Sequence, residues 1–328
     1  MTGMAGGFIA FGHDPDAAVY APRPYGSADG LTWAPTAASS AFAAAAGRQD
    51  VVLGADAEGR EIVAVGADEA GDQSSASAAV WVSDDDGATW SRGAVPHAAD
   101  AELHAVAHGP AGWVAVGSDG FGGASAGLAG IRGTAVWTSP DGHAWTRSPA
   151  SIDSGVAQHV VRDGTGYTAS GVALPSSASP AARWHSADGR AWSTLPSPAL
   201  LEAIESTGAS TWVVVGTDAG HRPGIWSSGD GASFAPGLAG AAQPPAGVRM
   251  TGVASNGRCW LAVGTDIKSD PIAGMAWASA DGRDWQLSET LPGAGIGLLA
   301  VSGDRFAVTS AADQSDGSTL RQVQAATC

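Results

Sequence analysis

Short segments in which apolar and polar residues alternate recur along the whole chain, separated by clusters of glycine, aspartate and serine. One group of segments lies at 103–108 (LHAVAH), 113–117 (WVAVG), 134–139 (TAVWTS) and 144–149 (AWTRSP). Alternation with a period of two residues is typical of half-buried β-strands, and the glycine and aspartate clusters are typical of tight turns. The sequence therefore predicts units of four antiparallel strands. They recur about every 50 residues, which is the period expected of β-propeller blades.

A short turn motif, called the repeated turn below, contains a serine, an aspartate, a glycine and a closing aromatic residue at nearly constant spacing. Its serine and aspartate side chains can hydrogen bond to the backbone of a tight hairpin, and its glycine permits a positive φ. We therefore expect a structural role for its aspartates rather than six active sites. The motif occupies residues 27–33, 83–90, 139–145, 186–192, 228–234 and 279–285, and its aspartates are Asp29, Asp85, Asp141, Asp188, Asp230 and Asp281.

Three aromatic positions recur in register with these turns, and together they contain all 13 tryptophans of the chain. The first position precedes a small residue by four places, the second lies two residues before the serine of the repeated turn, and the third closes the turn. Tryptophans confined to such positions are expected to pack one repeat against the next.

The pattern Ser-x-Asp-(x)-Gly-x-x-Trp resembles the Asp-box, or BNR, repeat of sialidase-like β-propellers, and the resemblance spans essentially the whole chain. Only residues 83–90 carry the full-length spacing, because the other five turns lack one residue. We expect an all-β fold, a seven-bladed β-propeller of four-stranded antiparallel blades, forming one domain over residues 1–328. The first repeat lacks an obvious innermost strand and the last stops after its third strand. Six blades with a terminal extension is therefore the alternative.

In an antiparallel four-stranded blade, the repeated turns leave one face, while the connections from the second to the third strand and between blades leave the other. The long, irregular segments lie on this second face, where functional residues concentrate. Five of these segments open with Gly-x-Asp. The candidate ligand-binding residues on this face are Asp14, Asp68, Asp119, Phe121, Asp218, His221, Arg222 and Asp266.

The five Gly-x-Asp carboxylates allow two interpretations. If their strands end near the mouth of a central channel, they form a partial acidic ring that attracts a cation such as calcium, or a basic partner segment. Alternatively, each aspartate caps its own loop through an Asx-turn. No other cofactor is expected, because the sequence has no glycine-rich phosphate loop, no Cys/His zinc spacing and no serine elbow.

The charge balance narrows the classes of partner. A formal net charge of −16 repels phosphate backbones, so sequence-independent nucleic-acid binding is not expected. No apolar run approaches the roughly 18 residues that a membrane-spanning helix needs.

The sialidase resemblance implies an arginine triad for a substrate carboxylate, a tyrosine activated by a glutamate, and an aspartic acid. The sequence offers Tyr20 as the one tyrosine outside the packing positions, and Arg23, Arg132 and Arg222 with no spacing that pairs them. We therefore expect a non-enzymatic, monomeric scaffold that binds a glycan or protein partner on its loop face. The alternatives are a diverged glycoside hydrolase that uses loop-face carboxylates, and a subunit of a larger assembly.

The family resemblance implies a secreted or cell-surface protein. The chain contains two cysteines, Cys259 and Cys328, which the blade layout would place on adjacent blades. A closing disulfide is feasible there and would fit an oxidising compartment. The alternative is a free terminal thiol at Cys328.

Overall fold

The computed structural model describes residues 1–13, 21–37, 39–43, 45–121, 130–149, 152, 155–174, 181–207, 210–237, 243–292, 294–313 and 319–327. Two compact units make up the chain. The first contains Met1–Ser27 and Trp33–Leu195, and the second contains Ala28–Thr32 and Pro196–Cys328. Each unit is described by itself, and the expectation of one domain over residues 1–328 stays a prediction.

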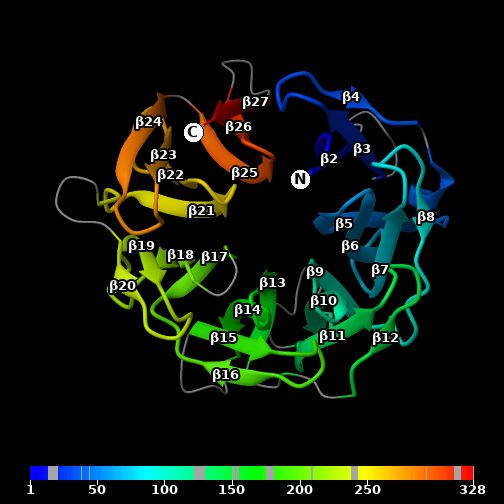
Figure 1. Cartoon of the computed structure of the whole chain (residues 1–328). Helices are drawn as coiled ribbons and strands as arrows, with labels where there is room; N and C mark the ends of the chain where they lie inside the picture. Colours follow the sequence, from blue (N-terminus) through cyan, green and yellow to red (C-terminus); the bar gives the residue numbers. More distant parts are fainter. Residues whose placement is uncertain are drawn as a thin grey trace. The chain divides into compact units, whose positions relative to one another are not determined.

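The first unit contains the sheets drawn from blue to green in Figure 1, each with its strands antiparallel and in sequence order. The first sheet comprises β1 (Thr2–Met4), β2 (Gly7–His13), β3 (Pro22–Ser27) and β4 (Ala34–Pro35); the second, β5 (Arg48–Glu58), β6 (Glu61–Ala70), β7 (Ala76–Ser83) and β8 (Ser91–Arg92); the third, β9 (Ala101–Gly109), β10 (Gly112–Asp119), β11 (Gly133–Ser139) and β12 (Thr146–Arg147); the fourth, β13 (Gly155–Asp163), β14 (Gly166–Ala173), β15 (Ala181–Ser186) and β16 (Ser193–Leu195).

The second unit continues the same arrangement with three sheets among its described residues. The fifth sheet comprises β17 (Leu200–Ser206), β18 (Trp212–Thr217), β19 (Pro223–Ser228) and β20 (Ala235–Pro236); the sixth, β21 (Val248–Ser255), β22 (Trp260–Asp266), β23 (Ala273–Ser279) and β24 (Gln286–Pro292); the seventh, β25 (Gly295–Ser302), β26 (Arg305–Asp313) and β27 (Thr319–Thr327).

This architecture confirms the predicted all-β propeller fold. Across the described ranges, six sheets have four antiparallel strands, the seventh has three, and the single helical segment is the 3-10 turn η1 (Ser40–Phe42). The expectation that the first repeat lacks its innermost strand is wrong. Residues Thr2–Met4 form β1 and pair with β2, although three residues are too few to show an alternating pattern in the sequence.

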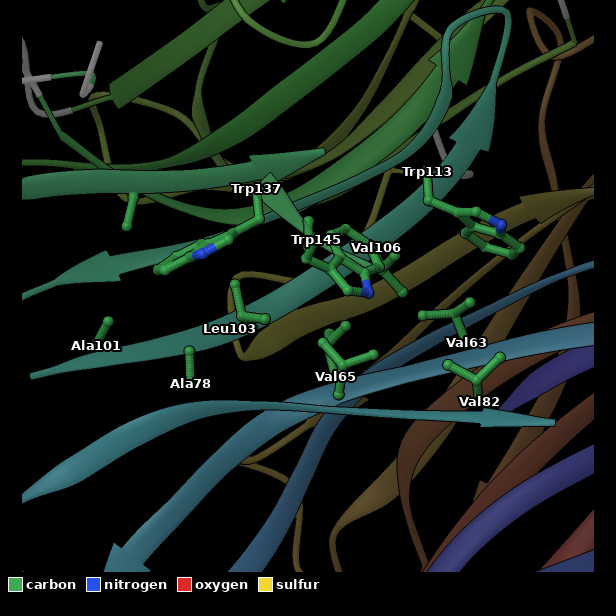
Figure 2. Packing of buried hydrophobic residues seen from close by; sticks show 13 residues of the cluster. Val63, Val65, Ala78, Val82, Ala101, Leu103, Val106, Trp113, Trp137 and Trp145 are labelled. Carbon is green, nitrogen blue, oxygen red and sulfur yellow. The ribbon is translucent and has the colours of Figure 1, made fainter. Parts of the chain in front are cut away.

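The aromatic positions pack sheet against sheet, as predicted. Figure 2 shows Trp113, Trp137 and Trp145 of the third sheet above the valines Val63 and Val65 of the second, and all five side chains are buried. Each buried aromatic side chain removes about 150–250 Å² from water, so the interfaces between sheets supply much of the apolar core. Ten of the 13 tryptophans are buried in this way; Trp33, Trp192 and Trp226 are half-buried.

A β-bulge interrupts the innermost strand of the second to seventh sheets near its middle. In the second and third sheets, the glycine of the second strand lies at this bulge. A Cβ on Gly66 would overlap the carbonyl oxygen of Val51, and one on Gly117 would overlap that of Glu102. The segment predicted at 113–117 ends at Gly117, but β10 continues past this glycine to Asp119. Both glycines lie within their strands and admit the bulged neighbouring backbone.

The repeated turns have the hairpin geometry that their residues predict. In the turn of the third sheet, Asp141 accepts hydrogen bonds from the backbone N–H groups of His143 (3.1 Å) and Ala144 (3.0 Å) and from the Ser139 hydroxyl (3.0 Å). Gly142 has φ 66°, and its carbonyl accepts the indole N–H of Trp145 at 2.6 Å. Equivalent aspartate-to-backbone bonds occur at Asp29, Asp85, Asp188, Asp230 and Asp281.

Candidate functional site

The antiparallel order gives each sheet two distinct ends. The repeated turns leave one end, and the connections from second to third strand and to the next sheet leave the other, which we call the loop end. The Gly-x-Asp residues lie at this loop end. Asp68 is near the end of β6, Asp119 and Asp266 end β10 and β22, and Asp218 follows β18, whereas Asp14 lies outside the described residues.

Two of these aspartates cap their own loops. Asp218 accepts hydrogen bonds from the backbone N–H groups of Gly220 (2.8 Å) and Arg222 (2.9 Å), and it also pairs with the Arg222 guanidinium at 2.9 Å. His221 is exposed in the same loop, in a left-handed conformation with φ 58°. Asp266 accepts the backbone N–H of Lys268 at 3.0 Å. The local-capping interpretation therefore describes the geometry of both aspartates.

The equivalent aspartate of the second sheet lies in an ion-pair cluster. Asp68 pairs with Arg48 at 2.6 Å and with Arg92 at 3.8 Å, and Arg92 also donates to Asp50 at 2.6 Å. The Asp50 side chain is fully buried, and the Arg92 guanidinium lies over the Trp81 ring at 4.8 Å. The two arginines and the two aspartates therefore neutralise one another at the loop end of the second sheet.

Asp119 of the third sheet binds two arginines. Its Oδ1 accepts hydrogen bonds from Arg132 Nη2 at 2.8 Å and lies 2.9 Å from Arg147 Nη2. Arg132 also donates to Asp100 at 3.0 Å, and Arg147 lies over the Trp137 ring at 4.9 Å. Burial opposes ionisation of Asp119, but the hydrogen bonds and charges of the two arginines outweigh it and lower the pKa of this carboxyl group.

A pocket of about 350 Å³ opens beside this network, and we call it the Asp119 pocket. It lies at the loop end, because its lining comes from the end of β10, from β11 and β12, and from the connections before β9 and after β12. Asp119 and Arg147 supply its charged groups, and Pro149 supplies exposed apolar surface, whereas Ala135 and Val136 are buried behind it. The lining consists of His97, Asp119, Ala135, Val136, Arg147, Ser148 and Pro149.

The connection between β8 and β9 carries unusual backbone conformations at this pocket. His97 (φ 55°) and Asp100 (φ 58°) are non-glycine residues in the left-handed region. Such conformations persist where surrounding contacts hold them, and they cluster at binding sites. Here the His97 carbonyl accepts a hydrogen bond from Arg147 at 3.1 Å, and Asp100 accepts the backbone N–H of Phe121 at 3.1 Å.

The structure thus brings together two of the sequence-predicted residues, Asp119 and Phe121, with three that no sequence pattern predicted, His97, Asp100 and Arg147. A weak signal for Arg147 was present in the sequence. Arginine follows the closing tryptophan of the repeated turn by two residues in the second and third repeats, in Trp-Ser-Arg at 90–92 and Trp-Thr-Arg at 145–147.

The arginines considered for a carboxylate-binding triad are engaged locally. Arg132 pairs with Asp100 and Asp119, Arg222 pairs with Asp218, and the Arg23 guanidinium lies 5.9 Å from the centre of the Tyr25 ring. Tyr20, the tyrosine candidate, lies outside the described residues.

Three further findings concern ions, membranes and thiols. In the part of the chain that the structure describes, no three His, Cys, Asp or Glu side chains gather in a way that could hold a metal ion. Within the same residues, no helix is long and apolar enough to cross a membrane. Cys259 is disulfide-bonded, and Cys328, the other cysteine of the chain, lies outside the described residues.

No protein-family model matches the chain, and no curated protein matches it by sequence. Solved structures resemble it in fold. An acylaminoacyl peptidase from Pyrococcus horikoshii has 10% identity, a TM-score of 0.57, and matches over 96% of this chain and 48% of its own. A prolyl endopeptidase structure has 10% identity, a TM-score of 0.55, and matches over 99% and 49%. The chain therefore spans about half the length of these two peptidases.

The six-bladed propeller lectin of Aleuria aurantia has 12% identity and a TM-score of 0.42 over 99% of this chain and 92% of the lectin. At 10% identity, the likeness to the two peptidases shows the fold alone.

Proposed function

We propose that the protein is a non-enzymatic recognition scaffold that binds a glycan at its loop end, in the Asp119 pocket. The observation that carries this proposal is the pocket itself, which combines a carboxylate and a guanidinium with the exposed side chain of Pro149. Its volume of about 350 Å³ is at the small end of the range of small-molecule sites, roughly 300–1,000 Å³. One sugar residue of a larger glycan is a ligand of suitable size.

The lining suits the two faces of a sugar ring. Sugar hydroxyls both donate and accept hydrogen bonds, and Asp119 offers acceptor oxygens beside the donor groups of Arg147. The C–H groups of a sugar ring are apolar and can lie against the exposed Pro149. Because ion pairs and the Trp137 ring hold Arg147 in place, little conformational entropy is lost on binding.

The electrostatics of the pocket favour binding over hydrolysis. A glycosidase needs a carboxylic acid whose pKa is raised, so that it can protonate the leaving group. The carboxyl group that lines this pocket, Asp119, instead has a lowered pKa, because the hydrogen bonds from Arg132 and Arg147 outweigh the effect of its burial. It is therefore suited to accept hydrogen bonds as a carboxylate.

We further propose that the chain is a diverged sialidase-like propeller of the Asp-box type and acts outside the cell or at its surface. The hydrogen bonds of the repeated turns support the first point, since they make the aspartate a hairpin cap in each repeat. The disulfide at Cys259 supports the second, because disulfides persist mainly in oxidising compartments.

A glycan array followed by calorimetry of the best ligand tests the proposal. We expect wild-type protein to bind at least one glycan, and Asp119→Asn to weaken that binding about tenfold, through loss of the carboxylate acceptor. Asp266→Asn is the matched control, because it changes the equivalent Gly-x-Asp residue of the sixth sheet and should leave affinity unchanged. Thermal unfolding of both variants verifies that they are folded.

Three results would overturn the proposal. The first is an array without a bound glycan, and the second is an equal loss of affinity for Asp119→Asn and Asp266→Asn. The third is turnover of chromogenic glycosides by the wild-type protein, which would establish the hydrolase alternative instead.

A further inference from the structure

The charges around the Asp119 pocket balance within the protein. Two guanidinium groups, Arg132 and Arg147, face two carboxylates, Asp100 and Asp119. Both terminal nitrogens of Arg132 bind these carboxylates, at 3.0 and 2.8 Å. Of the terminal nitrogens of Arg147, one pairs with Asp119 at 2.9 Å and the other donates to the His97 carbonyl at 3.1 Å.

This balance bears directly on which ligands the pocket can accept. Arginine recognises a carboxylate by directing two parallel N–H groups at its two oxygens. In this pocket each terminal nitrogen of the two arginines already directs an N–H group at a protein acceptor, and each guanidinium charge is balanced by a protein carboxylate. A ligand carboxylate could reach only the remaining N–H groups, and it would add an uncompensated negative charge beside Asp119.

The exposed groups of the pocket point to the same conclusion. Asp119 lines the pocket with 17% of its side chain exposed, so an anionic ligand would meet a like charge there. Like charges placed side by side in an interface oppose binding. The formal net charge of −16 adds a long-range repulsion of anions.

We infer that the Asp119 pocket selects uncharged, hydroxyl-rich sugars and rejects sugars that carry a carboxylate, such as uronic and sialic acids. This inference rests on the proposed function and specifies its ligand class. It also separates the chain from the carboxylate recognition that a sialidase resemblance implies. A hydroxyl group can donate to the free lone pairs of Asp119 and accept from the outer N–H groups of Arg147 without breaking either ion pair.

Matched pairs of sugars test the selection. Glucosides and glucuronides, galactosides and galacturonides, and desialylated and sialylated forms of one glycan are compared by array and calorimetry at physiological salt. We expect the neutral member of each bound pair to bind about tenfold more tightly or better. Equal or tighter binding of the carboxylated member would overturn the inference and leave glycan recognition standing. Binding of neither member would overturn the proposed function, and the inference with it.

A charge-neutralising variant locates the cause of the selection. Asp100→Asn leaves the cluster of Arg132, Arg147 and Asp119 with one uncompensated positive charge, while the amide oxygen can still accept the Phe121 N–H. We expect this variant to bind the carboxylated sugars more tightly and to reduce the preference about threefold or more. The control is Asp304→Asn, which removes one negative charge from an exposed turn of the second unit and should change nothing. Equal effects of the two variants would contradict a local origin.

Discussion

The second and third sheets place the same three kinds of side chain at their loop ends, with different results. In both sheets an arginine of the fourth strand lies over the tryptophan of the third strand and pairs with the Gly-x-Asp carboxylate of the second. In the second sheet, the shortest ion pair of Arg92 is to the buried Asp50, at 2.6 Å. In the third, Arg147 lines a pocket.

One position on the innermost strand accounts for the difference. Asp50 lies opposite Asp68 in the register of β5 and β6, whereas Ala101 lies opposite Asp119 in that of β9 and β10. A carboxylate at this position takes the shortest ion pair of the arginine, whereas an alanine leaves the arginine to pair with Asp119 and the His97 carbonyl. The residue at this one inner position therefore distinguishes an arginine that neutralises a buried carboxylate from an arginine that lines a pocket.

Replacing the stacked arginine by leucine should reduce the free energy of unfolding much more in the second sheet than in the third. Arg92→Leu leaves the buried carboxylate of Asp50 without its hydrogen-bond donor, and breaking a buried ion pair costs about 3–5 kcal/mol. Arg147→Leu leaves Asp119 paired with Arg132, so we expect a loss of about 1 kcal/mol. Urea unfolding at neutral pH measures both free energies of unfolding.

The pH dependence of Arg92→Leu gives an independent check. Burial raises the pKa of Asp50 above its ordinary value of 3.8, and the hydrogen bond and charge of Arg92 oppose this rise. Without Arg92 the folded-state pKa rises further, so the penalty is full above that pKa and is relieved as the pH falls towards 3.8. The variant should lose less stability at acidic than at neutral pH. Equal losses for the two leucine variants would refute the assigned difference between the sheets.

Substituting the bulge glycines should instead affect the two sheets alike. A Cβ on Gly66 or on Gly117 overlaps a carbonyl oxygen of the neighbouring inner strand, and relieving such overpacking costs about 1–3 kcal/mol. Thermal and urea unfolding of Gly66→Ala and Gly117→Ala measure this cost. The control is Gly6→Ala, because a Cβ on Gly6 meets no atom within 4 Å, and this variant should be nearly neutral. Gly303 is equally open but has a positive φ, so its substitution would add backbone strain. A neutral result for Gly117→Ala would show that the bulge can shift at little cost.

The smallest effects are expected in the repeated turns, again equally in both sheets. Hydrogen bonds lower the pKa of Asp85, chiefly that from the Thr89 hydroxyl, and that of Asp141, chiefly that from the Ala144 backbone N–H. Because Asp141 is exposed and Asp85 is half-buried at the surface, each asparagine variant should lose only about 0.5 kcal/mol. A lowered folded-state pKa stabilises the fold above 3.8, and this stabilisation is lost as the pH falls through the folded-state value. Melting temperatures of wild type and Asp141→Asn should therefore converge in acid; a constant difference would assign the loss to another cause.

The parts of the structure that the sequence predicted are those governed by neighbouring residues. The repeated turns follow from hydrogen bonds between Asp141 and groups two or three residues away, and strand alternation follows from the local period of two. The burial of Trp137 followed from the recurrence of its position. By contrast, β1 escaped prediction, because three residues carry no period.

The candidate site was only partly accessible from the sequence. Asp119 and Phe121 followed from the Gly-x-Asp pattern and loop length, whereas His97, Asp100 and Arg147 carry no local mark of a common site. Their meeting depends on the register that sets Arg147 opposite Trp137 and on the connection that brings Asp100 to Arg132.

The sequence by itself determined the repeating sheets and their turns, because hydrogen bonds within a hairpin and the alternation of a strand act over a few residues. Tertiary structure alone decided that Arg92 is used to neutralise a buried carboxylate while Arg147 lines a pocket. That difference depends on the innermost-strand residue opposite the Gly-x-Asp carboxylate, which is Asp50 in the second sheet and Ala101 in the third. Asp50 lies 42 positions before Arg92, and Ala101 lies 46 positions before Arg147. Each comes near its arginine only once the strands have paired.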